Sequence, residues 1–170
     1  PAYGSAALGY ANYEKAKVRL TNDGGYVMIG SMRDMNIHGI NALDGFVIKI
    51  DALGGLQWQE RIGGGDYDSF SGIQQTSDGG YVISGSTASF GQLGLDYSIT
   101  NARDVYLIKL NSVGTLKWSK TYGVVDVSEY GTDVVKAADG GFAIASLIED
   151  VVIGVSGLLI KTDANGTIKW

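Results

Sequence analysis

The residues best suited to bind something outside the protein are acidic and aromatic side chains between apolar stretches. Asp66, Tyr67 and Asp68 follow three consecutive glycines, and Asp126 and Glu129 occupy a corresponding segment further along the chain. Carboxylates at turns are oxygen ligands of the kind that Ca²⁺ takes, and tyrosine beside acidic groups suits stacking on a sugar or capture of a protein segment. The candidate ligand-binding residues are therefore Asp66, Tyr67, Asp68, Tyr97, Asp126 and Glu129.

A metal or cofactor has less support than a sugar or protein ligand. Asp66 and Asp68 are the candidate calcium ligands, but their spacing is not that of an EF-hand loop and acidic turns are common on protein surfaces. No motif for an organic cofactor is present, because Gly63-Gly64-Gly65 lacks the Lys-Ser/Thr that completes a phosphate-binding loop. We expect no cofactor, with calcium as the alternative.

Catalytic chemistry also has little support. His38 is the only histidine, and a Ser-His-Asp arrangement would need Asp34 or Asp44 to orient it, yet no Gly-x-Ser-x-Gly elbow accompanies it. A glycosidase would need two carboxylates roughly 5 to 9.5 Å apart, for which the available side chains are Asp66, Asp68, Asp126 and Glu149. We assign no catalytic residue.

Composition excludes several functional classes. The chain has 170 residues and a net charge of −5. Because it has no cysteine, disulfides, thiol catalysis and Cys-based metal sites are absent. The acidic balance argues against nucleic acid and anionic membranes as partners. The longest nearly apolar stretch, 151–160, is too short to span a bilayer.

The sequence repeats itself three times. Asp-Gly-Gly followed by an aromatic residue begins at Asp23, Asp78 and Asp139, and a second motif, Asp/Asn-x-x-Gly-x-x-x-Trp, follows each copy. The glycine pairs Gly24-Gly25, Gly79-Gly80 and Gly140-Gly141 supply tight hairpins. The aspartates of these turns offer calcium ligands, but capping of their own hairpins by Asx hydrogen bonds is the better interpretation.

Each copy predicts four short antiparallel strands, because alternating apolar and polar residues lie between turn residues. We expect no helix, so the fold class is all-β. The expected strands are 15–21, 26–31, 45–50 and 56–62, then 71–76, 81–86, 104–110 and 115–122, and finally 131–136, 142–147, 158–162 and 167–170.

The repeat resembles those of bacterial and archaeal β-propeller proteins, and its second motif is similar to the tryptophan-docking motif of quinoprotein-type propellers. The resemblance implies four-stranded blades, with Trp58, Trp118 and Trp170 as structural wedges between neighbouring blades. Such proteins are often secreted or on cell surfaces, so an extracellular or cell-surface location is expected. The quinone-binding and calcium residues of the enzymes have no counterpart in this chain.

The expected organisation is one propeller domain over 1–170, with blades at about 14–62, 67–123 and 128–170. Three blades are too few to close a ring, which takes about four to eight. Residues 1–4 match the segment that follows Trp118 and are expected to supply the missing half of an outer strand. Either two chains form a six-bladed homodimer, or the remaining blades belong to a longer propeller.

The expected function is that of a non-enzymatic structural or ligand-binding module. The segments between the second and third strand of each copy are long and unlike one another, as are the connections 63–70 and 123–130 between copies. The turns at Asp23, Asp78 and Asp139, and those at Asp51, Asn111 and Asp163, are tight and uniform. Variable loops on one face of a rigid scaffold commonly carry function, so the expected partner is a glycan or a protein. The alternative is a glycosidase or lyase that uses loop carboxylates at the central funnel.

Overall fold

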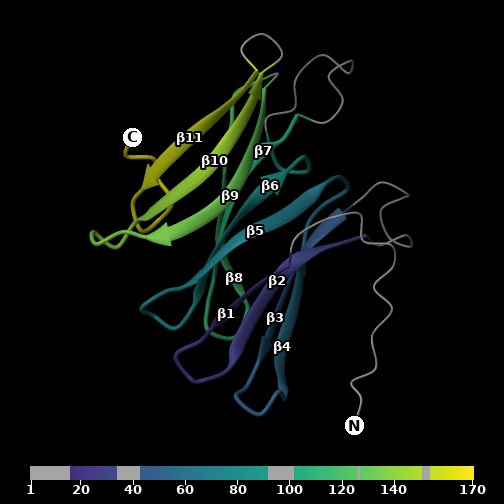
Figure 1. Cartoon of the computed structure of the whole chain (residues 1–170), viewed down its shortest axis with the longest axis vertical. Helices are drawn as coiled ribbons and strands as arrows, with labels where there is room; N and C mark the ends of the chain where they lie inside the picture. The colour runs from purple at the N-terminus through teal and green to yellow at the C-terminus, as the bar shows by residue number, and fades with distance from the viewer. Residues whose placement is uncertain (1–15, 34–42, 92–101, 126, 151–153) are drawn as a thin grey trace.

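The protein consists of β-strands in the part that its computed structural model describes, which is residues 16–33, 43–91, 102–125, 127–150 and 154–170. Eleven antiparallel strands form three sheets (Figure 1). The first sheet contains β1 (Lys17–Leu20), β2 (Tyr26–Arg33), β3 (Leu43–Ile50) and β4 (Leu56–Ile62). The second contains β5 (Asp68–Gln75), β6 (Tyr81–Thr87), β7 (Asp104–Leu110) and β8 (Leu116–Tyr122). The third contains β9 (Ser128–Lys136), β10 (Phe142–Asp150) and β11 (Gly154–Thr162).

The predicted all-β class is confirmed, with differences in detail. The third sheet has three full strands, and 167–170 adds only a short pairing in which Lys169 N donates to Lys161 O at 2.7 Å. β5 and β9 each begin three residues earlier than predicted, because a bulge lets the strand bend and continue pairing. Residues 1–4 lie outside the described residues. Nowhere in the described ranges is there a helix long and apolar enough to cross a membrane.

Each sheet is an antiparallel meander, so successive connections alternate between its two ends. The uniform turns 21–25, 51–55, 76–80, 111–115 and 137–141 lie at one end, called here the turn end. The connections between β4 and β5, β6 and β7, and β8 and β9 leave from the opposite loop end (Figure 1). The two classes of connection that the sequence distinguishes by length are therefore segregated in space.

The Asp-Gly-Gly turn is held by a lysine from the third strand of the same sheet. In the second sheet Gly79 has a φ of +77°, and a Cβ on Gly80 would lie 2.3 Å from the carbonyl oxygen of Leu110. Asp78 accepts from Gly80 N at 3.1 Å and from Lys109 Nζ at 2.9 Å. Lys109 also donates to Leu110 O at 2.9 Å. Glycine is thus needed twice, once for its positive φ and once for close backbone approach.

The same Asp–Lys pair occurs in all three sheets, as Asp23 with Lys49 and Asp139 with Lys161. Hydrogen bonds from Thr76 and Lys109 lower the pKa of Asp78 to about 2. The pKa values of Asp23 and Asp139 are also lowered, chiefly by the hydrogen bond from the lysine. An Asx hydrogen bond is present in every copy, so these carboxylates serve their own turns.

The tryptophan of each outer strand lies on the next sheet. Trp58 on β4 donates from Nε1 to Ser112 O at 3.2 Å, and its ring lies edge-on to Tyr81, 5.6 Å away. Trp118 on β8 packs against Phe142 at the equivalent position, tilted by 52° with 6.2 Å between ring centroids. Each indole also covers a turn glycine of positive φ, Gly114 for Trp58 and Gly166 for Trp118. The first two tryptophans therefore join neighbouring sheets.

Two apolar cores result, one between each pair of neighbouring sheets. The first core includes Val27, Ile29 and Val47 from the first sheet and Ile73, Ile83 and Ile108 from the second. The second core includes Val82 and Leu107 from the second sheet and Val134, Ile144 and Ile160 from the third. Each apolar strand residue that is buried this way contributes about 1.5–3 kcal/mol relative to exposure, so face-to-face packing dominates the stability of the fold.

Replacing Lys109 tests the Asp–Lys pair. Lys109→Met should lower the free energy of unfolding by about 1–3 kcal/mol, because Asp78 and the Leu110 carbonyl lose their common donor. Urea denaturation at pH 7 measures the change. Lys117→Met, at an exposed position of β8, is the control and should change stability by less than about 0.5 kcal/mol.

The effect of Lys109→Met should also depend on pH. Asp78 has a lower pKa in the folded protein than the ordinary value of 3.8, so its stabilisation is complete above pH 4 and is lost as the pH falls toward 2. The difference between wild type and variant should shrink over that interval. Equal urea midpoints at pH 7 for the two proteins would contradict a stabilising role for the pair.

Candidate functional site

Each contact between neighbouring sheets buries a pair of carboxylates near the loop end. Asp44 on β3 and Asp68 on β5 form the first pair, and Asp104 on β7 and Glu129 on β9 form the second. The positions are equivalent in strand register. All four residues are at most 3 % exposed. The repeat therefore places two acids together at both sheet-to-sheet junctions.

The first pair is well supplied with hydrogen-bond donors. Asp44 forms an ion pair with Arg61 of β4. Asp68 accepts from Gly64 N and Ser89 Oγ, both at 2.7 Å, and from the hydroxyl of Thr87. Burial nevertheless raises the pKa of Asp68, and the charge of Asp44 adds to the effect. Asp68 thus acts as an internal acceptor that orders the segments before β5 and after β6.

In the second pair, Glu129 receives fewer hydrogen bonds from the described residues than Asp68 does in the first. The register position of Arg61 is taken by Thr121 on β8. Glu129 accepts from Val124 N at 3.0 Å through Oε1, and no donor among the described residues reaches its Oε2. Burial, assisted by the charge of Asp104, raises the pKa of Glu129 to about 7. Glu129 is therefore a buried group whose charge changes near neutral pH.

A cation and two tyrosines cross the second junction at the surface. The Arg103 guanidinium carbon lies 3.5 Å from the ring centroid of Tyr67 and 5.6 Å from that of Tyr130. Tyr130 donates to Glu149 at 3.2 Å, and the Arg103 carbonyl accepts from Glu129 N at 2.6 Å. Such cation–π contacts contribute about 0.5–1 kcal/mol at exposed sites. The arrangement joins the start of β5 to the start of β9.

The structure separates the six predicted ligand-binding residues into three groups. Asp66 is exposed and Tyr67 is half-buried under Arg103. Asp68 and Glu129 are buried in different acidic pairs. Tyr97 and Asp126 lie outside the described residues. Within the described ranges, no three His, Cys, Asp or Glu side chains gather in a way that could hold a metal ion.

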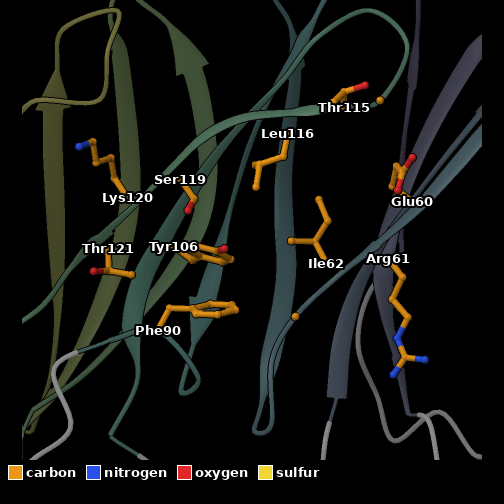
Figure 2. Close-up of a pocket in the computed structure, with 12 residues that line it drawn as sticks. Glu60, Arg61, Ile62, Phe90, Tyr106, Thr115, Leu116, Ser119, Lys120 and Thr121 are labelled. Atoms are coloured by element: carbon orange, nitrogen blue, oxygen red, sulfur yellow. The ribbon is translucent and has the colours of Figure 1, made fainter. Parts of the chain in front are cut away.

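A groove of about 600 Å³ runs between the outer strands of the first and second sheets. β4 contributes Glu60 and Ile62, and β8 contributes Ser119 and Thr121, with Phe90 reaching in from the connection after β6. Figure 2 shows the rings of Phe90 and Tyr106 one above the other, with Ser119 beside Tyr106. The volume of the groove is within the usual range for a small-molecule site.

The groove combines an aromatic surface with hydrogen-bonding groups. Phe90 is 48 % exposed, and its ring lies 5.5 Å from that of Tyr106 at an angle of 34°. Burial raises the pKa of Tyr106, partly opposed by a hydrogen bond with Ser119, so this phenol is neutral at physiological pH. The charged residues among those that line the groove are Glu60, Arg61 and Lys120. An apolar ring face bordered by hydroxyl groups suits a polyhydroxylated ligand.

Sequence reasoning missed this groove, because its walls come from strands about 60 residues apart that look like ordinary outer strands. One signal was available. Phe90 is a bulky aromatic residue in a connection of small and polar residues, Thr87-Ala88-Ser89-Phe90-Gly91. An aromatic residue there has no strand to bury it, which indicates a contact made by the connection itself.

Replacing Glu129 tests the second acidic pair. Because the pKa of Glu129 is about 7 in the folded protein and 4.5 ordinarily, the folded state holds the proton more tightly and stability should fall as pH rises from 4.5 to 7. Glu129→Gln should remove this fall and exceed wild type in stability above pH 7. Denaturant midpoints from pH 4 to 9 measure the difference, with Glu149→Gln at an exposed carboxylate as the control. Parallel pH profiles for wild type and Glu129→Gln would contradict the assignment.

Comparisons with known proteins identify no relative of this chain, so its function is inferred from the geometry above. The chain matches no protein-family model, and no curated protein matches it in sequence.

Proposed function

We propose that this chain is a non-enzymatic structural and ligand-binding module of the β-propeller type, which holds a carbohydrate in the groove between β4 and β8. The propeller part of the proposal is supported by the repeated contact between sheets. Both contacts use the same faces, the same tryptophan position and the same strand register. Blades that repeat radially around an axis make this type of contact.

The half-exposed Phe90 ring stacked on Tyr106 is the observation that carries the ligand class. Sugar rings present C–H faces to aromatic rings, while their hydroxyl groups need polar partners at the edge. Ser119, Thr121 and Glu60 supply such partners around the aromatic pair. Because Phe90 belongs to the connection after β6, the groove also fits the expectation that the long connections carry function.

A binding role is favoured over catalysis by the state of the carboxylates. The acids with raised pKa values, Asp68 and Glu129, are at most 2 % exposed and lie inside the sheet junctions. General acids and bases must come within hydrogen-bond reach of the substrate. The groove itself carries a single carboxylate, Glu60, among its lining residues, whereas hydrolysis of glycosides generally uses a pair.

Titration calorimetry with cellohexaose, chitohexaose, xylohexaose and mannohexaose tests the proposal. At least one of these neutral oligosaccharides should bind to the wild-type chain. Phe90→Ala should weaken that binding about tenfold, equivalent to ~1.4 kcal/mol, because the stacking surface is removed. Leu53→Ala, at an apolar position 94 % exposed and outside the groove, is the matched control and should bind like wild type.

Two results would overturn the carbohydrate assignment. One is the absence of binding by all four oligosaccharides at millimolar concentration. The other is a binding constant that Phe90→Ala leaves unchanged, which would place the ligand elsewhere on the molecule.

A further inference from the structure

The outward face of the first sheet exposes residues that are buried in the other two sheets. Val18 on β1 is 56 % exposed, whereas its register equivalents Ile73 and Val134 are 0 % and 1 % exposed. Tyr26 on β2 is 43 % exposed, while Tyr81 and Phe142 at the same position are 1 % and 3 %. In the second and third sheets this face receives the tryptophan of the preceding sheet. The first sheet therefore presents a receiving face without a neighbour among the described residues.

The outward face of the third sheet shows the complementary pattern. Leu159 on β11 is 52 % exposed, whereas its register equivalents Val47 and Leu107 are fully buried. Trp170 is 66 % exposed, while Trp58 and Trp118 are half-buried against the next sheet. The turn glycines show the same contrast, since Gly114 and Gly166 are buried under an indole and Gly54 is only half-buried. The third sheet thus presents an inserting face, with its tryptophan undocked.

Resting on the propeller part of the proposed function, we propose that the inserting face of the third sheet binds the receiving face of the first sheet in a second copy of this chain. Trp170 would then lie against Tyr26 and the 51–55 turn of the second copy, as Trp58 lies against Tyr81 and the 111–115 turn. The two faces are the two halves of a contact that this chain makes twice internally. A second copy supplies both halves in the correct order.

The contact is heterologous, because one face differs from the other, and such contacts form rings when the rotation closes. Two copies with three sheets each give six sheets, which is within the range of about four to eight at which propellers close. Closure also covers the exposed apolar side chains on both faces, which a soluble protein would otherwise present as a large patch. The occupant that fits both faces at once is therefore a second copy in a two-chain ring.

Sedimentation equilibrium at micromolar concentration measures the assembly. The wild-type chain should have twice its mass of 17.9 kDa. Val18→Lys on the receiving face and Leu159→Lys on the inserting face should each sediment as a single chain, because both charges fall in the contact. Both positions are exposed in one chain, so circular dichroism should show that the variants keep their sheets. Val124→Lys, exposed on the connection after β8, is the control and should stay dimeric.

Mixing the two variants tests the direction of the contact. Val18→Lys retains an intact inserting face and Leu159→Lys an intact receiving face, so an equimolar mixture should recover two-chain particles through one contact. A dimer that survives Val18→Lys or Leu159→Lys alone would overturn the proposal, since it would indicate pairing between identical faces. A wild-type monomer would also overturn it, as would a mass that grows with concentration beyond two chains.

The outcome is independent of the carbohydrate proposal. The groove between β4 and β8 lies within one chain, so a folded monomeric variant should keep its oligosaccharide binding. A wild-type monomer that binds an oligosaccharide would contradict the dimer proposal alone. A wild-type dimer that binds none of the oligosaccharides would contradict the carbohydrate proposal alone.

Discussion

The packing of one sheet's tryptophan face onto the aromatic face of the next is the interaction on which this structure depends. A four-stranded meander has two apolar faces and cannot cover either by itself. In this chain one face carries Trp58 or Trp118, and the other carries Tyr81 or Phe142 with a flat glycine turn beside it. Aromatic pairs of this kind add about 0.5–1.5 kcal/mol to the free energy of apolar burial. Because the two faces differ, the contact has a direction, and stacking can proceed only in that direction.

The turn end and the loop end of the sheets contain different kinds of polar group. At the turn end a lysine beneath each Asp-Gly-Gly turn neutralises the aspartate and satisfies a strand carbonyl. At the loop end two carboxylates meet at each junction and are desolvated by the neighbouring sheets. At the turn end, each aspartate charge is therefore paired with a lysine of the same sheet, and this pair repeats in all three sheets. The loop end depends on what its connections supply, which is why, among the described residues, Asp68 has three donors and Glu129 has one.

The fold was largely predictable because its determinants are local. Asp78-Gly79-Gly80 specifies a hairpin by the positive φ of one glycine and the close approach at the other, and alternation specifies the strands on either side. The buried lysine was not predicted, since Lys109 in an apolar strand reads as an exposed residue until the aspartate from a turn 31 residues earlier is placed beside it. Burial of Asp68 and Glu129 was missed for a related reason. A bulge extends β5 and β9 into segments that the turn-like glycines and acids had marked as connections.

The function of this chain is harder to derive from its sequence than its fold is. Residues that repeat in all three copies form the turns and the contacts between sheets, so they do not indicate a ligand. A candidate site must come from positions where the copies differ, and the two junctions differ at Arg61 against Thr121. Arg61 forms an ion pair with the buried Asp44, whereas Thr121 places a short polar side chain in the wall that β8 gives to the groove. The β8 wall of the groove therefore carries a short side chain where β4 carries an arginine, and the connection after β6 adds Phe90.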